Sequence, residues 1–257
     1  AKAMALGDAY ISLADEPSAI FWNPAGLTYQ QHYKLSLSHE NLYAIPGFYN
    51  DMLALNIPLK TVHLGFGWSQ MMLEGEYAEQ VTIISGAYKK SVGDFDISLG
   101  LNAKHLYAHL MNSYEGSNPE SSISGFKIPG KLDADAGALI KYHQLSLGGS
   151  ARNLLKPDFE FDDKSYQLPL SMGAGLSYKW NAGLLLTGDY HWDKNSSSWH
   201  VGSEIWFYNV FAPRLGMSDS NLTAGFGLKS RQWTLDGAMY AHEKLGSTYR
   251  VEFGWIF

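Results

Sequence analysis

The chain ends with Tyr249-Arg-Val-Glu-Phe-Gly-Trp-Ile-Phe257, in which bulky apolar residues occupy every odd position. Arg250, Glu252 and Gly254 lie between them, on the other face. A period of two indicates a β-strand whose faces meet different environments. An aromatic-rich face that ends on Phe is typical of the last strand of a bacterial outer-membrane β-barrel. Because a strand of a soluble sandwich can also alternate, the rest of the chain has to distinguish the two.

The same alternation recurs along the chain after about residue 30. The clearest segments are 62–68, 95–101, 168–176, 199–205, 222–228 and 233–239, and weaker ones are 32–40, 49–58, 79–89, 133–142, 145–152, 183–192 and 210–217. With the terminal strand these make about fourteen strands, and bacterial single-chain barrels have an even number. We expect the last strand to close the barrel by pairing with the first, near residues 33–38.

The links between these segments differ in length according to their order. Links after even-numbered strands are short, as at 59–61, 143–144 and 230–231, whereas the long links, roughly 109–132 and 153–167, follow odd-numbered strands. Outer-membrane barrels show this asymmetry, with short periplasmic turns and long extracellular loops. The pattern predicts a bacterial outer-membrane protein whose two termini are periplasmic.

The polar face of the strands is rich in glycine, as at Gly65, Gly100, Gly173 and Gly225. A solvated strand face more often carries Lys, Glu or Thr, and glycine inside a strand marks the close approach of another group. We therefore expect the apolar face to contact lipid and the glycine face to contact a plug inside the barrel.

Composition excludes several classes of function. The net charge of −6 argues against nucleic-acid binding. The absence of cysteine excludes disulfides, thiolate chemistry and Cys-based metal sites. The acidic run at 157–163 lacks the spacing of an EF-hand, so we expect no metal and no cofactor. The chain begins without Met or a leader, which suggests a mature form after removal of a signal peptide.

The predicted lumen face carries eleven charged residues, six basic and five acidic. They are Lys34, Asp96, Lys104, Lys141, Asp189, Glu204, Arg214, Lys229, Asp236, Arg250 and Glu252. Unpaired charges in a narrow lumen are costly, so this nearly balanced set predicts an internal ion-pair network. The network would hold the plug against the wall, or it would line a selective conduit.

The first thirty residues do not alternate. Asp15 and Glu16 before Pro17 indicate a helix start, because Pro suits an early helical position and acids suit the positive end of the helix dipole. The run Asn23-Pro24-Ala25-Gly26 then indicates a turn. We interpret residues 1–30 as a short helical hatch inside a barrel formed by residues 31–257.

The run from Gly7 through 14–18 to 23–27 resembles the N-terminal signature of the PorV/PorQ family, a branch of the FadL-like outer-membrane barrels. The likeness extends to 151–154 with 168–170, to 222–228 and to the terminal strand. The resemblance implies a fourteen-stranded barrel with a hatch, in which Asp15, Pro17, Asn23, Pro24 and Gly26 form the gate. It also implies that Phe257 is part of the signal for the barrel-insertion machinery.

Two functions follow from the resemblance. The leading hypothesis is a non-enzymatic PorV-type barrel that docks or stabilises a protein partner in the envelope. The alternative is a FadL-like conduit for small hydrophobic molecules. The hatch is shorter than that of FadL-type barrels, and the loops are shorter than those of PorV-type barrels, so neither activity transfers directly.

Exposed apolar residues on long loops often mark interfaces, so Phe126, Ile128, Phe159 and Phe161 are the candidate partner contacts. The other partners we expect are outer-membrane lipid and lipopolysaccharide. A Ser/His/Asp site can be drawn from His191, Asp193, His200 and the serines at 196–198. No nucleophile motif frames these serines, and we expect no enzyme activity.

Overall fold

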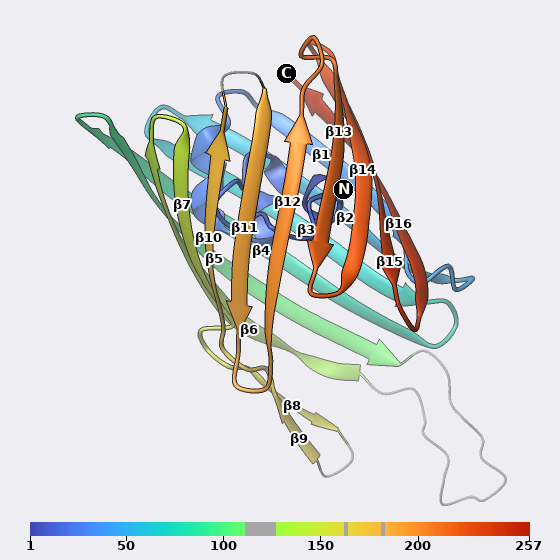
Figure 1. Ribbon diagram of the computed structural model, residues 1–257. Coiled ribbons are helices and arrows are strands. Elements are labelled where there is room, and N and C mark those ends of the chain that lie inside the picture. Colours follow the sequence, from blue (N-terminus) through green and yellow to red (C-terminus); the bar gives the residue numbers. More distant parts are fainter. Residues whose placement is uncertain (111–126, 162–163, 181–182) are drawn as a thin grey trace, which may run out of the picture.

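The computed structural model describes residues 1–110, 127–161, 164–180 and 183–257. Fourteen antiparallel strands form one closed barrel (Figure 1). They are β1 (Lys34–Asn41), β2 (Phe48–Leu59), β3 (Val62–Leu73), β4 (Tyr77–Val92), β5 (Phe95–Leu110), β6 (Lys127–Tyr142), β7 (Leu145–Arg152), β10 (Ser171–Lys179), β11 (Leu184–Trp192), β12 (Ser197–Ile205), β13 (Phe211–Ser218), β14 (Asn221–Lys229), β15 (Trp233–His242) and β16 (Gly246–Ile256). The predicted fold class and strand number are confirmed.

The two ends of the sheet meet where the terminal alternation predicts. Strand β1 pairs with both β2 and β16, and its register against β16 runs from Lys34↔Ile256 to Asn41↔Tyr249. Each pair of neighbouring strands is hydrogen-bonded, so the described wall is continuous.

The side chains of the wall are sorted as in a barrel surrounded by lipid. On β16, Tyr249, Val251 and Phe253 are 49%, 55% and 40% exposed, whereas Arg250 and Glu252 are buried at 9% and 3%. The apolar face therefore points outward and the polar face points into the lumen, which is the reverse of a soluble barrel.

Among the described residues, no helix is long and apolar enough to cross a membrane.

The two ends of the barrel differ in their connections. At one end, which we call the turn end, the links are short, as at 60–61, 93–94, 143–144 and 230–232. At the other, the loop end, β5 ends and β6 begins, and the long link between β7 and β10 lies there. Figure 1 shows the C-terminus at the turn end and the hairpin β8–β9 projecting at the loop end.

The hairpin differs from the link that the sequence predicts at 153–167. Strand β8 (Asp158–Phe161) pairs with β9 (Lys164–Gln167), and Phe159 stands opposite Tyr166. The aromatic and acidic residues of this run alternate, which suits a strand, and a cross-strand aromatic pair stabilises such a ladder. The run is therefore a small hairpin outside the barrel sheet, and not an irregular loop.

Residues 1–30, called the N-terminal segment below, lie inside the barrel (Figure 1). They contain α1 (Lys2–Ala5) and two short 3₁₀ helices, η1 (Pro17–Phe21) and η2 (Pro24–Tyr29). Leu6, Tyr10, Ile11, Ile20 and Leu27 are fully buried and supply the apolar core. Pro17 starts η1 as expected, but Glu16 precedes it in extended conformation without capping it through its side chain.

Candidate functional site: the barrel lumen

Glycines on the lumen face of the wall allow the N-terminal segment to pack closely against it. A Cβ atom on Gly202 would lie 2.7 Å from Leu6 Cβ, and one on Gly148 would lie 2.6 Å from the Ile11 carbonyl oxygen. On Gly216 it would collide with the backbone of Leu6 and Gly7. The glycine face of the strands is thus the surface against which the segment packs.

Polar wall residues bond the irregular backbone of residues 7–11. Asp189 Oδ2 accepts hydrogen bonds from the N–H groups of Tyr10 and Ile11, both at 2.6 Å. Thr187 Oγ1 donates to the Ala9 carbonyl at 3.0 Å, and His200 Nδ1 lies 2.7 Å from the Gly7 carbonyl oxygen. Buried backbone groups outside regular structure need such partners, so these residues fix the path of the segment.

Asn23 links the two halves of the segment to the wall. Its Nδ2 donates to the carbonyls of Ile11 at 2.9 Å and Ala138 at 3.2 Å, and its Oδ1 accepts from the Ala25 N–H at 3.1 Å. It therefore caps η2, with Pro24 as the first residue of that helix. At Gly26 a Cβ would collide with Ala14, so the two turns of the segment also touch there.

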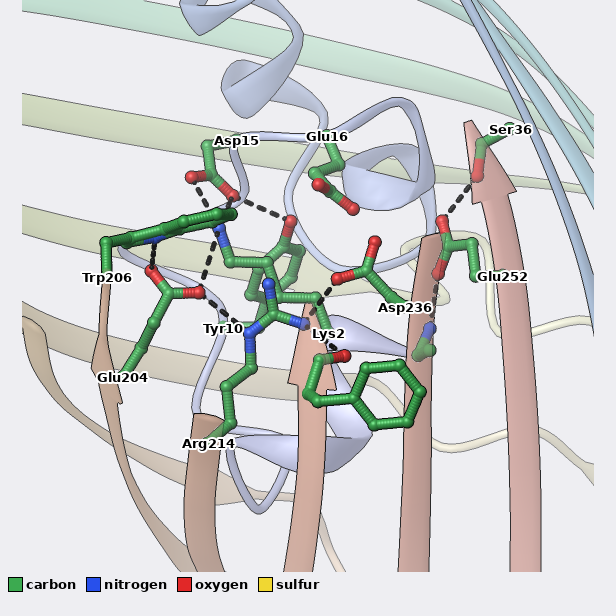
Figure 2. Close-up of polar contacts among 12 residues, drawn as sticks. Lys2, Tyr10, Asp15, Glu16, Ser36, Glu204, Trp206, Arg214, Asp236 and Glu252 are labelled. Atoms are coloured by element: carbon green, nitrogen blue, oxygen red, sulfur yellow. Dashed lines mark hydrogen bonds and ion pairs between the residues drawn. The ribbon is translucent and has the colours of Figure 1, made fainter. Parts of the chain in front are cut away.

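A cluster of charges, most of them buried, lies near the turn-end termini of β12 and β13. Figure 2 shows their contacts. Arg214 Nε donates to Glu204 Oε2 at 2.7 Å, and its Nη1 binds Asp236. Lys2 Nζ of the segment lies 2.8 Å from Asp15 and 3.9 Å from Glu204. Tyr10 and Trp206 donate to the same two carboxylates, Asp15 at 2.9 Å and Glu204 at 2.7 Å.

The charge of Lys2 is fixed by these acids. Burial alone would lower the pKa of its ammonium, but Asp15 and Glu204 raise that pKa above the ordinary value. Lys2 therefore remains protonated at neutral pH and needs its two carboxylates. Asp15, predicted to start a helix, acts instead as an ion-pair partner within the segment.

The other predicted lumen charges form separate groups. Lys104 pairs with Asp133 and Asp135 at 2.8 and 2.6 Å. Arg250 pairs with Glu40, Asp96 with Lys89, and Lys34 with Glu16. Glu252 binds Ser36 and the amino nitrogen of Ala1. Lys141 lies over the ring of Tyr29, and Lys229 is exposed at the turn end.

Most of the predicted lumen charges are thus paired, but in several separate groups that the N-terminal segment and the strand register determine. Sequence reasoning missed Lys2, Glu40, Asp133 and Asp135. Asp133 and Asp135 are two residues apart on one strand, so the period of two placed both on the face of Lys141. Nothing in the sequence signals that Lys2 reaches Glu204.

Two cavities lie in the lumen, one on each side of the N-terminal segment. The loop-end cavity, of about 490 Å³, is lined by residues that include Asp8, Trp22, Arg152, His191 and His200. The turn-end cavity, of about 630 Å³, is lined by residues that include Leu13, Tyr29, Lys141, Lys179 and Leu185.

The serine and histidine residues of the loop-end cavity do not form a catalytic triad. Ser198 Oγ lies 2.8 Å from His200 Nε2, but the other ring nitrogen of His200 faces the Gly7 carbonyl and no carboxylate. Asp193 accepts hydrogen bonds from the N–H groups of Asn195 and Ser196, which lower its pKa below the ordinary value. His191 lies 3.9 Å from Asp189, which already binds the segment.

An apolar pocket of about 440 Å³ lies at the loop end under the hairpin β8–β9. Its lining includes Tyr77, Val81, Leu106, Phe159 and Tyr166. Of the predicted partner contacts, Phe159 is half-buried and lines this pocket. Phe126 lies outside the described residues, and so do the side chains of Ile128 and Phe161.

No protein-family model matches this sequence. No curated protein matches it either. Solved structures resemble it over nearly its whole length. Toluene transporter TbuX of Ralstonia pickettii aligns with a TM-score of 0.63 at 12% identity, covering 99% of this chain and 97% of that chain. A Pseudomonas aeruginosa FadL homologue aligns at 0.68 with 12% identity and the same coverage.

The fold is that of the FadL-like barrels. A third example, the CymD monoaromatic hydrocarbon channel, aligns with a TM-score of 0.65 at 13% identity, covering 99% of this chain and 96% of that chain. At such identities the likeness concerns the fold.

Proposed function

We propose that this protein is a gated conduit for small hydrophobic molecules across the bacterial outer membrane, with the N-terminal segment as its gate. The observation that carries the proposal is the position of this segment between two lumenal cavities inside a continuous described wall. The structures with the same fold include proteins described as a monoaromatic hydrocarbon channel and a toluene transporter. This favours transport over the docking function that the sequence first suggested.

The apolar pocket at the loop end is the proposed entry site. Its volume of about 440 Å³ falls in the range of small-molecule sites, and its lining is mostly aromatic and aliphatic. A hydrophobic molecule held there would lie between the hairpin β8–β9 and the loop-end parts of β4 and β5. From this pocket it would enter the lumen at the loop end.

The gate has to move for a molecule to pass. The segment is held by hydrogen bonds and ion pairs, and it contributes no strand to the barrel sheet. It could therefore shift without breaking the wall. Asn23, Pro24 and Gly26 lie at the contact between its two turns, where a small rearrangement would separate them.

We further propose that the turn end faces the periplasm and that the apolar outer face contacts outer-membrane lipid and lipopolysaccharide. The exposed Phe257 at the turn end would then be available to the barrel-insertion machinery. Short periplasmic turns and longer extracellular loops are the usual arrangement in such barrels.

A reversible disulfide tests the gate. Thr28 Oγ1 of η2 lies 2.7 Å from Ser98 Oγ of β5, and the chain has no cysteine of its own. The variant Thr28→Cys/Ser98→Cys would lock the segment to the wall under oxidising conditions. We expect initial uptake of labelled toluene, by Gram-negative cells that lack their own transporters for hydrophobic molecules, to fall at least tenfold and to recover after reduction.

The two single-cysteine variants are the matched controls and should transport like the wild type in both conditions. Transport by the oxidised double variant at the wild-type rate would show that this segment is not the gate. Uptake by the wild type no faster than by cells without the protein would exclude the conduit itself.

Partner docking is the second candidate. The N-terminal motif still resembles the PorV/PorQ branch, and Tyr166 on the projecting hairpin β8–β9 is 56% exposed. Replacing residues 158–167 by a Gly-Ser linker should then abolish the recovery of a protein that copurifies with the wild type in mild detergent. Copurification that survives this replacement would count against docking through the hairpin.

A further inference from the structure

Exposed charges are segregated between the two ends of the barrel. Among the described residues at the turn end, the exposed charged side chains are six basic and one acidic, namely Lys60, Lys90, Lys141, Lys179, Lys229, Arg231 and Asp94. At the loop end they are six acidic and three basic, namely Glu74, Glu76, Glu79, Asp158, Glu160, Glu243, Lys156, Lys194 and Lys244. The turn end is therefore basic although the whole chain has a net charge of −6.

Lys90 and Arg231 lie two residues from the exposed aromatic residues Tyr88 and Trp233, whereas Lys141 and Lys179 line the turn-end cavity of the lumen. A belt of exposed aromatic residues surrounds the turn end on the lipid-facing side, and it consists of Tyr88, Phe95, Tyr142, Tyr178, Trp180, Phe211, Trp233 and Trp255. Such belts mark the boundary between the hydrocarbon core and the headgroups. Lysines next to the belt extend their ammonium groups toward that boundary.

One part of this surface is a pocket at the rim of the lumen. It has a volume of about 530 Å³, and its lining combines Lys60, Thr61, Tyr88 and Lys90 of the rim with Thr28 and His63 of the lumen. The N–H of Lys89 donates to the Thr61 carbonyl at 3.0 Å, which fixes the β2–β3 turn against β4. Asp96 lies 2.6 Å from Lys89, the third lysine of this pocket, so Lys60 and Lys90 supply its excess positive charge.

A second groove of about 900 Å³ lies elsewhere on the turn end. It combines Lys229 and Arg231 with the apolar side chains of Val210, Trp233 and Phe257. Two neighbouring cationic side chains would attract an anionic headgroup, and the exposed apolar side chains beside them would contact hydrocarbon chains.

We propose that the turn end is a binding surface for anionic glycerophospholipids, with Lys60 and Lys90 as one headgroup site and Lys229 and Arg231 as another. Each lysine or arginine near an anionic membrane surface strengthens binding about fivefold. The loop end, with its excess of acids, would not bind these lipids. The inference is independent of what crosses the lumen.

The test is native mass spectrometry of the detergent-solubilised protein with phosphatidylglycerol and, separately, phosphatidylcholine. We expect the wild type to retain phosphatidylglycerol in preference. The variant Lys60→Gln/Lys90→Gln should lose that preference by about tenfold or more, and 0.5 M salt should weaken it in the wild type. The matched control, Lys156→Gln/Lys194→Gln at the loop end, removes the same charge and should leave the preference unchanged.

Equal retention of the two lipids by the wild type would overturn the proposal. It would also be overturned if the loop-end variant lost the preference as much as the turn-end variant did. Binding of polyglutamate that depends on Lys60 and Lys90, without any preference for phosphatidylglycerol, would assign the surface to an acidic polypeptide and exclude lipid. Gel mobility of unheated samples confirms that both variants are folded.

Discussion

Two layers of the same lumen wall hold the N-terminal segment by different means. In the layer nearer the loop end, Gly202 and Gly216 admit the backbone of Leu6 and Gly7. Two residues along the same strands toward the turn end, Glu204 and Arg214 form buried ion pairs. The glycine layer leaves room for the backbone of the N-terminal segment, whereas the charged layer contains the ion pairs. The position of the segment therefore depends on steric fit in one layer and on electrostatic attraction in the other.

The largest effect is expected in the charged layer. Replacing Arg214 by Met leaves the buried Asp236 carboxylate without its ion-pair partner and leaves Glu204 with Lys2, at 3.9 Å, as its remaining one. Such a loss typically costs about 3–5 kcal/mol. Thermal unfolding of the detergent-solubilised barrel, followed by tryptophan fluorescence, measures it. The variant Arg214→Met/Asp236→Asn removes both charges of one pair, keeps Glu204 for Lys2, and should recover most of the loss. If the stability does not recover, the Arg214 side chain stabilises the barrel by its packing and not by its charge.

The glycine layer should respond to volume. Gly216→Val places a side chain against the backbone of Leu6 and Gly7, and we expect a loss of about 3 kcal/mol together with faster proteolysis of residues 1–30. The control is Gly86→Val, because a Cβ there meets nothing within 4 Å. Equal behaviour of the two variants would refute the steric role of this layer.

Asn23 tests the junction between the two turns of the segment. Asn23→Asp keeps the acceptor for the Ala25 N–H but turns a carboxylate oxygen toward the carbonyls of Ile11 and Ala138. We expect a loss of about 2 kcal/mol in thermal unfolding. Asn209→Asp, in an exposed turn, serves as the control. A loss of similar size at Asn209 would show that the effect comes from the added charge.

The smallest effect is expected at the rim. Lys89 pairs with Asp96 at 2.6 Å, but both side chains are 31% exposed. Lys89→Gln should therefore change the free energy of unfolding by no more than about 0.5 kcal/mol. A loss of stability above about 2 kcal/mol would show that ion pairs at the mouth of the lumen stabilise the fold as strongly as the buried ones do.

The sequence predicts the barrel because strand periodicity is local. Alternation at Tyr249–Phe257 and its repeats determines which face is outside, and the burial of Arg250 and Glu252 agrees. Ion-pair partners depend instead on which strands meet. Arg250 finds Glu40 only because β16 closes on β1, and Lys104 finds Asp133 only through the β5–β6 register.

The position of the N-terminal segment has a consequence for assembly. Helix α1 contacts β13, β14 and β15, whereas η1 and η2 contact the strands from β1 to β6. The closing pair Lys34↔Ile256 joins residues 222 positions apart (256 minus 34). Such a contact carries a large loop-closure entropy and forms slowly. Because the N-terminal segment touches both the earliest and the latest strands, it links the two ends of the sheet by a second route besides the closing pair of strands.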